Sequence, residues 1–345
     1  MRVRSTRPGN RWRWLVAGVV SAAIVTVLGL SAVSPFRAGA RYQVVATDQV
    51  AATPTPEATA AVAPTPAAKP EPYPGAAYLM EGGELPDVPY KPLANKAAQD
   101  RPLSYETRCH QGELGTTVNT CEFGPAHAFR TIALVGDSHS AHWLPALQAV
   151  ADEFGWHIVS MTKSSCRLGI YGSDTPEHAS CRVWNSGVLR SLQALRPDLV
   201  LTRATEGSGR RDYMLAASSI PQWRALREMG IPVIALRDNP WYSFDVPQCV
   251  ATYGPAARRC GSDRAQRGLV EPIVIPAGYT LPTGVHLLDL TDLYCEPTYC
   301  PAVVGNVLVL RDSHHFTATY AATMGPYLAG EIVKLMGWQD RMAFV

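Results

Sequence analysis

Short runs of apolar and β-branched residues alternate along the chain with longer segments in which apolar residues recur at helical spacing. Such alternation is typical of a parallel sheet with helices on both faces, joined by right-handed crossovers. The six expected strands are residues 131–135, 157–161, 198–201, 232–236, 286–289 and 307–310. The four expected helices are residues 140–153, 182–195, 211–229 and 317–336. The pattern therefore predicts an α/β fold, a three-layer sandwich around a parallel sheet.

The first residues have a different pattern. Residues 1–13 carry five arginines and no acidic residue, and residues 15–33 carry no charge. This apolar stretch is close to the roughly 20 residues that cross a bilayer as a helix, and the arginines favour the cytoplasmic side. We therefore expect residues 1–36 to be a cytoplasmic tail and one transmembrane helix, with the rest of the chain outside the cell membrane. The alternative is a cleaved signal peptide and a secreted protein, because residues 38–40 resemble a cleavage site.

A Pro- and Ala-rich stretch follows. Residues 51–77 are mostly Ala, Pro and Thr, a composition that favours extended polyproline geometry and cannot build a core. We expect residues 37–100 to form an extracytoplasmic stalk with little regular structure, and residues 101–345 to form the folded domain. Within that domain, residues 241–284 are too long for an ordinary connection and are expected to form a disulfide-braced insertion.

All eight cysteines lie in the expected folded domain. An even number beyond a membrane segment favours disulfides over free thiols. Zinc is the weaker alternative, because the sequence contains no Cys-x-x-Cys. Eight cysteines allow about 105 connectivities, so their number alone does not determine the pairing. The couples expected from their proximity in the sequence are Cys109/Cys121, Cys166/Cys181, Cys249/Cys260 and Cys295/Cys300.

Overall composition narrows the functional classes. An apolar content of 47% is enough for a substantial core, and a formal net charge of +2 gives no indication of a nucleic-acid partner. No motif indicates a metal or another cofactor, and we expect none.

One serine lies where an open α/β sheet would place a functional group. Residues 134–139 read Leu-Val-Gly-Asp-Ser-His, so Ser138 follows an expected strand and precedes an expected helix. Ligands bind at such strand ends, and backbone N–H groups of the turn can stabilise an oxyanion. A serine hydroxyl needs a neighbouring base, usually a histidine oriented by a carboxylate. Taken alone, Gly-Asp-Ser is also ordinary turn chemistry.

A carboxylate and a histidine three residues apart precede the last expected helix. Asp312 and His315 have the spacing at which the carboxylate can face Nδ1 while Nε2 points to a hydroxyl. The simpler interpretation is that Asp312 caps the helix and that His315 is a partly buried polar group. The joint placement favours a site, because one motif follows the first expected strand and the other follows the last.

These two motifs resemble those of the SGNH (GDSL-type) hydrolase family. Residues 130–340 are most similar to the SGNH domain fused to membrane acyltransferase-3 proteins, which O-acylate cell-surface polysaccharides. The similarity rests on Gly136-Asp137-Ser138-His139 and on Asp312-x-x-His315-Phe316-Thr317. Further similar segments are Cys166, residues 288–295 and residues 318–321.

The resemblance implies a role for each residue of the motifs. Ser138 is the expected nucleophile, His315 the general base and Asp312 the acid that orients it. His314 is the competitor for the base, and the spacing together with the following Phe-Thr favours His315. Asp137 and His139 are expected to shape the turn.

The middle motifs of the family are absent. A typical member has Gly-x-Asn-Asp after the strand that begins Pro-Asp-Leu-Val, but residues 197–207 contain no asparagine. Ser165 or Gly169, beside Cys166, could supply the missing oxyanion donor. Asn239 follows an expected strand and could line the cleft, or it could simply form a turn before a proline. Trp143, Trp184 and Trp241 could stack on sugars, although core packing is the default for tryptophan.

The predicted function is that of an exported, membrane-anchored serine acyltransferase or esterase. It would act on O-acyl groups, most plausibly O-acetyl groups, of cell-envelope glycans through an acyl-enzyme at Ser138. Members of the fused family carry many membrane helices and this sequence predicts one, so a separate polytopic membrane protein could supply the acyl donor. The alternative is a catalytically weak glycan-binding or scaffolding domain that partners a membrane acyltransferase.

Overall fold

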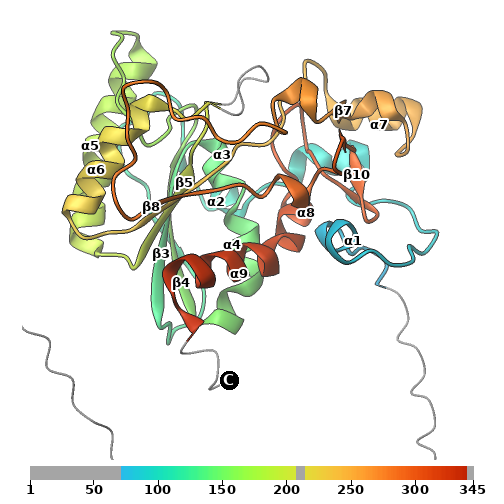
Figure 1. Cartoon of the computed structure of the whole chain (residues 1–345), viewed down its shortest axis with the longest axis horizontal. Coiled ribbons are helices and arrows are strands. Elements are labelled where there is room, and N and C mark those ends of the chain that lie inside the picture. The colour runs from blue at the N-terminus through green and yellow to red at the C-terminus, as the bar shows by residue number, and fades with distance from the viewer. Residues whose placement is uncertain (1–70, 207–213, 340–345) are drawn as a thin grey trace, which may run out of the picture. The chain divides into compact units, whose positions relative to one another are not determined.

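A computed structural model describes residues 71–206 and 214–339 of the chain (Figure 1). The strands of this part are β1 His110–Gln111, β2 Cys121–Phe123, β3 Arg130–Gly136, β4 Trp156–Lys163, β5 Leu199–Arg203, β6 Val233–Leu236, β7 Ser262–Asp263, β8 Val285–Leu288, β9 Tyr299–Cys300, β10 Val303–Val304 and β11 Val307–Leu308. Its α-helices are α1 Ala76–Glu81, α2 Leu103–Glu106, α3 Ser138–Ala141, α4 Leu144–Phe154, α5 Pro176–Leu195, α6 Ile220–Glu228, α7 Val246–Tyr253, α8 Ala318–Thr323 and α9 Gly325–Met336. Short 3-10 helices are η1 Ala94–Gln99, η2 Ala217–Ser219, η3 Arg258–Cys260, η4 Ala265–Arg267 and η5 Thr291–Leu293.

The expected membrane segment, residues 1–36, lies outside the described residues, as does the expected stalk before residue 71. Within the described ranges, no helix combines the length and the apolar character needed to cross a membrane. The transmembrane helix therefore stays a prediction.

Five parallel strands form the centre of the main sheet, in the order β4-β3-β5-β6-β8. At the β4 edge, β1 pairs in parallel and β2 antiparallel. β3 is the first of the five central strands in the sequence. The next strand, β4, lies on one side of it, and β5 lies on the other side. The carboxyl ends of β3 and β5 therefore flank the switch point at which open α/β sheets bind ligands.

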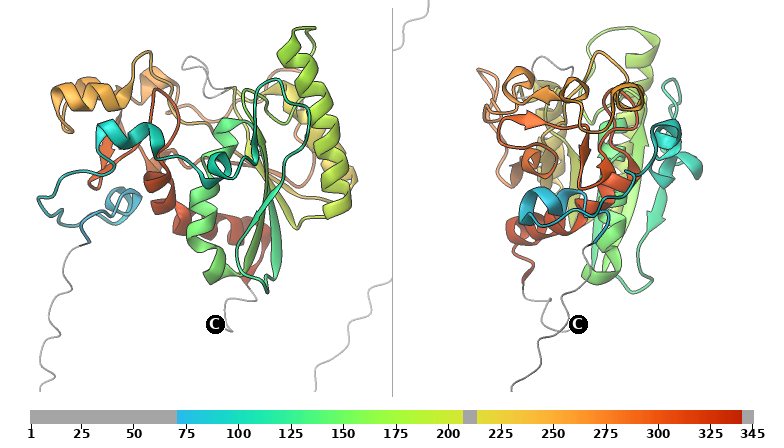
Figure 2. Two further views of the ribbon diagram at one scale, coloured as in Figure 1. Left: turned by 180° about the vertical axis from the view of Figure 1, so that it is seen from behind. Right: turned by 90° about the vertical axis from the view of Figure 1, so that its right-hand side faces the viewer.

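Side chains of β3 alternate between two hydrophobic clusters. Ile132 and Leu134 pack with residues of α4 and α9, whereas Ala133 and Val135 pack with residues of α5 and α6. Figures 1 and 2 show α5 and α6 along one face of the sheet and α4 and α9 along the other. The expected α/β fold with a mostly parallel central sheet is confirmed.

Five of the six expected strands occur in the main sheet, each with ends shifted by no more than two residues. The strand expected at residues 307–310 forms only over its first two residues and lies outside the main sheet. Val307 and Leu308 form β11, which pairs antiparallel with β10 in a separate two-stranded sheet. Gly305 and Asn306 both have positive φ, 52° and 59°, as a tight hairpin turn requires. The histidine-bearing loop after Leu310 therefore does not follow a strand of the main sheet.

The four expected helices also differ. The helix expected over 140–153 is divided into α3 and α4, and the one expected over 182–195 begins earlier, at Pro176. Residues 317–336 form two helices, α8 and α9, because Pro326 has no N–H to continue α8 and instead stands in the first turn of α9. The helix expected over 211–229 begins only at Ile220. Before it, Met214 and Leu215 form β-bridges, and the structure does not describe residues 207–213.

Residues 71–100 correct the expected domain boundary. They were predicted to belong to a stalk with little regular structure, but they form α1 and η1 and pack on the folded domain. Ala76 is fully buried, and its N–H donates to Thr323 Oγ1 at 3.0 Å. The amide of Asn306 donates to the carbonyl of Pro72 at 3.1 Å. A Pro-rich composition cannot build a core, but distant residues bind its free backbone groups here.

Four disulfides join the eight cysteines in the expected couples. Their Cα atoms lie 5.6, 5.7, 5.5 and 4.1 Å apart in Cys109–Cys121, Cys166–Cys181, Cys249–Cys260 and Cys295–Cys300. In the expected insertion, residues 241–284, a disulfide connects α7 to η3. Beyond η3, β7 pairs with β9, and β9 carries a cysteine of the fourth disulfide.

Candidate active site

Ser138 is the first residue of α3, and only Asp137 separates it from Gly136, the last residue of β3. Gly136 ends the strand with φ of 135°, and a Cβ at this position would clash with Ser140 Oγ. The Asp137 carboxylate then caps α3 by accepting the N–H groups of His139 and Ser140 at 3.0 and 3.3 Å. The glycine and the cap together fix the turn, so that Ser138 is half-buried at the switch point.

Asp312 and His315 meet this serine from the other end of the chain. Asp312 Oδ1 accepts the backbone N–H groups of His314 and His315, both at 2.8 Å, which fixes the loop around the carboxylate. Asp312 Oδ2 lies 2.8 Å from His315 Nδ1, and His315 Nε2 lies 2.9 Å from Ser138 Oγ. The three residues expected from the sequence therefore form one continuous hydrogen-bonded chain.

The charges of this chain favour a neutral imidazole that accepts a proton. Burial alone would raise the pKa of Asp312, but the hydrogen bond from His315 and those from two backbone N–H groups outweigh it, so its pKa is lowered. An ionised Asp312 can only accept, which places the proton of His315 on Nδ1 and leaves Nε2 free to accept the Ser138 proton. Burial lowers the pKa of His315 below 6.5, and the bond to Asp312 offsets part of that effect.

A second hydrogen-bonded chain lies beside the first. Asp238, two residues beyond β6, places Oδ1 2.6 Å from His139 Nδ1. His139 Nε2 lies 2.8 Å from His314 Nδ1, and the His314 ring lies 4.0 Å from the His315 ring, centroid to centroid. His139 therefore does more than shape the turn. His314 faces His139 and not Ser138, so the geometry favours His315 as the base.

A buried arginine joins Asp238 of the second chain to Asp137, the residue that caps α3. Arg203 is the last residue of β5, and its side chain is only 6% exposed. It forms ion pairs with Asp137 at 2.9 Å and with Asp238 at 3.2 Å. Burial would raise the pKa of both carboxyl groups, but the positive charge of Arg203 beside each of them, and the hydrogen bond that His139 donates to Asp238, outweigh burial and lower it. Both carboxylates are therefore ionised.

The three tryptophans have different surroundings. Trp143 and Trp184 are buried in the two hydrophobic clusters, as core packing predicts. Trp241 is only half-buried and stacks on the His314 ring at 4.1 Å between centroids and 10° between planes. Its indole N–H donates to Asp238 Oδ2 at 3.0 Å. Trp241 therefore belongs to the second hydrogen-bonded chain and remains partly accessible.

Two of the expected oxyanion donors are already engaged. The backbone N–H of Gly169 donates to Asn185 Oδ1 at 3.2 Å. The amide of Asn239 donates to the carbonyls of His314 and Pro240, at 2.6 and 3.3 Å. Asn239 therefore braces the loop of His314, and the Gly169 N–H is bonded to the side chain of Asn185.

Ser165, the third expected donor, is exposed and has φ of 56°. No hydrogen bond connects it to Ser138, Asp312 or His315 within the part of the chain that the structure describes. The strand-to-helix turn offers the backbone N–H of Ser138 itself.

Among the residues that the structure describes, two groups of side chains lie close enough together to hold a metal ion: His139, His314 and His315, and His139, His142 and Asp238. Within each group the ligand atoms lie within 4.8 Å of one another. His139 belongs to both groups, and both of its ring nitrogens already take part in hydrogen bonds. Hydrogen bonds between these side chains account for their close approach without a bound ion.

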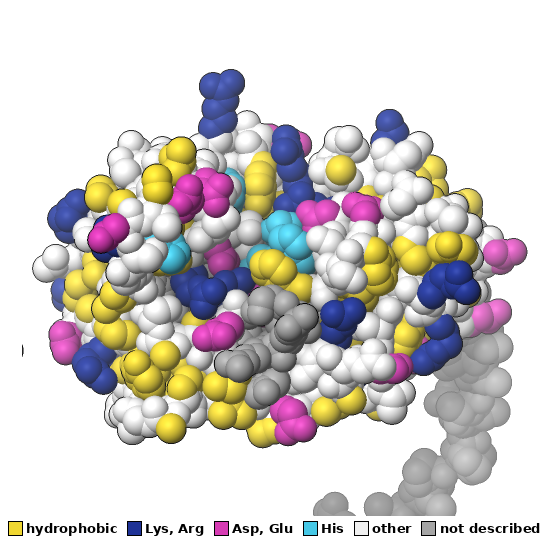
Figure 3. Space-filling model, turned by 90° about the horizontal axis from the view of Figure 1, so that it is seen from above, with side chains coloured by type: hydrophobic (Ala, Val, Ile, Leu, Met, Phe, Trp, Pro, Cys, Tyr) yellow, Lys and Arg dark blue, Asp and Glu magenta, His cyan; other side chains and the backbone are white. Residues whose placement is uncertain are grey.

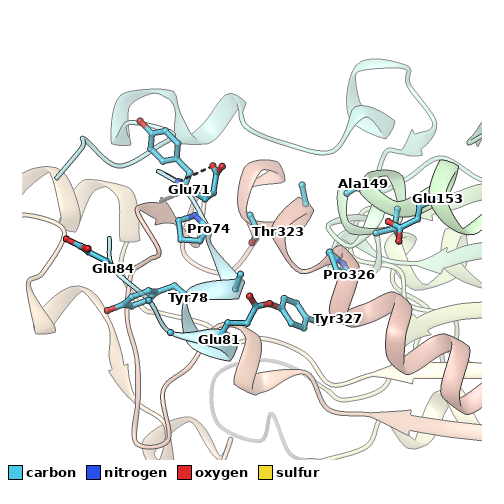
Figure 4. A pocket seen from close by; sticks show the side chains of 16 residues that line it. Glu71, Pro74, Tyr78, Glu81, Glu84, Ala149, Glu153, Thr323, Pro326 and Tyr327 are labelled. Carbon is cyan, nitrogen blue, oxygen red and sulfur yellow. Dashed lines mark hydrogen bonds between the residues drawn. The ribbon is translucent and has the colours of Figure 1, made fainter. Parts of the chain in front are cut away.

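One large cavity lies elsewhere. A pocket of about 760 Å³ is lined by α1, α4, α8 and α9, including Tyr78, Glu81, Glu153, Thr323 and Tyr327 (Figure 4). It contains neither the serine nor the histidines of the hydrogen-bonded chains. Figure 3 looks down on the molecule of Figure 1 from above and shows histidine side chains exposed near the middle of that face. Chemistry, not cavity size, therefore identifies the candidate site.

Residues 108–330 match the family described as the SGNH domain fused to AT3 domains, and this match covers more than half of the chain. The chain belongs to this family. A solved structure, the periplasmic domain of a lipopolysaccharide acetyltransferase from Salmonella ser. Paratyphi A, aligns with a TM-score of 0.44 and 14% identity. That alignment covers 75% of this chain and 95% of the other. A comparison with curated proteins found no match.

Sequence reasoning missed Arg203 and Asp238 in this SGNH domain. A signal was present, since Arg203 ends one buried strand and Asp238 follows the next. Charged residues at the carboxyl ends of adjacent parallel strands meet at one edge of the sheet. Arg203 stands after the Pro-Asp-Leu-Val strand, in the segment where the wider family has its asparagine.

Proposed function

We propose that this SGNH domain is a serine acyltransferase or esterase that acts on O-acyl groups, in particular O-acetyl groups, of cell-envelope glycans. The observation that carries the proposal is the continuous chain from Asp312 through His315 to Ser138, with distances of 2.8 and 2.9 Å. Nucleophile, base and orienting acid within hydrogen-bond reach are the signature of an activated serine. Membership of a family of domains fused to AT3 domains supports acyl transfer as the chemistry.

The reaction follows from the proton positions. His315 Nε2 takes the Ser138 proton as Ser138 Oγ attacks the acyl carbonyl, and the protonated His315 then gives the proton to the leaving oxygen. The resulting acyl-enzyme is released when an acceptor hydroxyl attacks it and passes its proton to His315. Transfer to a sugar and hydrolysis by water differ only in the acceptor.

Location and partners complete the proposal. Four disulfides are typical of an oxidising, extracytoplasmic environment. With the predicted membrane helix in residues 1–36, the domain would face envelope glycans from the outer side of the cell membrane. A separate polytopic membrane protein would supply activated acyl groups, as AT3 domains are fused to other members of the family.

One observation favours the alternative, a catalytically weak domain that binds glycan or scaffolds a membrane acyltransferase. The side-chain amide of Asn239 and the backbone N–H of Gly169 are engaged elsewhere, so the wider family's asparagine donor has no replacement from either residue. Loss of one oxyanion donor costs about 10²–10³ in kcat. Ser138 would still be activated by His315, but its acylation would be slow.

The deciding experiment is chemical labelling of the full chain in detergent. It is incubated with para-nitrophenyl acetate and with a serine-reactive phosphonate, beside Ser138→Ala. We expect release of nitrophenol and phosphonate attachment at Ser138, both lost in the variant. If the unmodified chain shows no turnover and no labelling of Ser138, the enzyme proposal is refuted and the alternative, a glycan-binding or scaffolding domain, is favoured. Adding glycans to the same reaction distinguishes transfer from hydrolysis.

A further inference from the structure

The mechanism above uses Asp312 and His315 but leaves the second chain, Asp238-His139-His314, without a role. Four donors bind the Asp238 carboxylate: His139, Arg203, the Trp241 indole and the backbone N–H of Asn239. A lowered pKa keeps this carboxyl ionised. The carboxylate therefore only accepts hydrogen bonds. This determines which atom donates in the bonds that connect Asp238, His139 and His314.

The proton positions can be read outward from Asp238. His139 Nδ1 must carry a proton to donate to Asp238 Oδ1 at 2.6 Å, so a neutral His139 accepts through Nε2. His314 Nδ1, 2.8 Å away, must then be the donor. His314 Nε2 is left with a lone pair. Burial lowers the pKa of His314 below its usual 6.5, so the ring is neutral at neutral pH.

His314 is held rigidly. Its backbone N–H donates to Asp312 and its carbonyl accepts the Asn239 amide at 2.6 Å. Trp241 stacks on the ring, and His315 contacts it at 4.0 Å between centroids. Within the described residues Nε2 has no hydrogen-bond partner, and it is not among the buried polar atoms, so it is open to solvent. His314 Nε2 is thus a hydrogen-bond acceptor held in a fixed position beside the chain of Asp312, His315 and Ser138.

Two neutral imidazoles, His315 and His314, therefore present acceptor nitrogens from adjacent rings. An acceptor alcohol that attacks the acyl-enzyme directs its own proton to His315 Nε2. A second hydroxyl on a neighbouring carbon of the same acceptor could donate to His314 Nε2. Trp241, stacked on His314 and partly accessible, adds the kind of aromatic surface on which sugar rings pack.

We propose that His314 is the acceptor-binding residue of this site and that it selects polyols with adjacent hydroxyls, such as sugar rings. Asp238 and His139 are positioning residues that hold its tautomer. This inference rests on the proposed acyl transfer and deepens it. In the transfer step the acceptor oxygen bonds to the acyl carbon, its proton passes to His315, and the Ser138–acyl bond breaks as His315 returns the proton to Ser138. His314 only accepts a hydrogen bond.

The first test measures acceptor preference. The full chain in detergent is given para-nitrophenyl acetate with ethylene glycol or with methoxyethanol, in which one hydroxyl is methylated. We expect ethylene glycol to be acetylated about fivefold more readily per hydroxyl, the size of one net hydrogen bond. His314→Phe keeps an aromatic ring for Trp241 and should abolish the preference, whereas His314→Gln keeps an acceptor and should retain part of it.

The preference is a ratio within each variant, so general changes in activity cancel. His127→Phe, a matched change at an exposed histidine outside the site, should keep the wild-type ratio. An equal preference in His314→Phe and the wild-type chain overturns the proposal. So does the opposite order, loss in His314→Gln and retention in His314→Phe, because it would indicate that only ring packing matters.

The second test does not depend on acyl transfer. Nitrogen NMR of the histidine-labelled Ser138→Ala chain should show His314 as a neutral ring protonated on Nδ1. Its Nε2 resonance should shift when ethylene glycol is added and shift less with methoxyethanol. A proton on Nε2, or no response to ethylene glycol, overturns the inference. Failure of Ser138 labelling in the unmodified chain would instead overturn the proposed function.

Discussion

Replacing Asp312 by Asn changes one atom of the triad and preserves the loop that carries it. Asp312 Oδ1 accepts two backbone N–H groups at 2.8 Å, and the amide oxygen of Asn can accept both. The other oxygen, which lies 2.8 Å from His315 Nδ1, becomes an NH₂ donor. His315 must then turn Nδ1 into an acceptor and move its proton to Nε2. A protonated Nε2 cannot take the proton of Ser138.

The size of the effect follows from the exposure of the carboxylate. In a serine protease with a buried acid, the same substitution lowers kcat about 10⁴-fold because it fixes the wrong tautomer. The Asp312 side chain is 32% exposed, so water can stabilise part of the imidazolium charge that forms during the reaction. We therefore expect a loss of about 10³-fold in the acylation rate, which corresponds to about 4 kcal/mol of transition-state stabilisation.

The assay is the rate of phosphonate attachment at Ser138 together with nitrophenol release from para-nitrophenyl acetate. Asp174→Asn is the matched control, because the Asp174 side chain is 98% exposed and its partner is Arg182. Thermal unfolding of both variants checks that the fold is intact. A rate for Asp312→Asn within tenfold of the wild-type rate, in a folded protein, would refute the assignment of Asp312 as the orienting acid.

Three further predictions concern the pH profile, the buried arginine and one disulfide. Because burial holds the pKa of His315 below 6.5, the acylation rate should rise with pH and level off with a midpoint below 6.5; a midpoint above 7 would contradict this. Arg203→Met leaves buried carboxylates without their cation and should lower the free energy of unfolding by about 3–5 kcal/mol in urea titration, whereas Arg130→Met, at a pair about one-third exposed, should cost under about 1 kcal/mol. Replacing Cys166 and Cys181 together by Ala should cost about 3 kcal/mol in the same titration, from the 15-residue separation of the pair; an unchanged midpoint would show that the bridge does not constrain the unfolded chain.

Local signals in the sequence were sufficient for the central sheet and for the triad residues. Buried parallel strands need apolar, β-branched runs, so β3, β4, β5, β6 and β8 were recognisable without knowledge of their partners. The pairing of neighbouring cysteines also followed from short separations. The turn at Gly136 and the three-residue spacing of Asp312 and His315 are local geometry.

Other features depend on contacts between distant residues, and no local signal determines them. Residues 71–100 pack on the domain through apolar contacts and through the hydrogen bonds that Thr323 and Asn306 make to their backbone groups. β11 has the composition of a strand of the main sheet. The chain reverses direction at Gly305, however, so β11 pairs with β10 in a hairpin.

The sequence by itself determined an α/β fold and the proposed nucleophile, base and acid that the fold brings together, because each is encoded within a few neighbouring residues. Only the tertiary structure decided that Arg203 and Asp238 meet Asp137 and His139, because the ends of three parallel strands become neighbours only when the sheet forms. The same contacts decided which of two adjacent histidines faces Ser138. His315 is turned to the serine, and His314 to His139, by partners far away in the sequence.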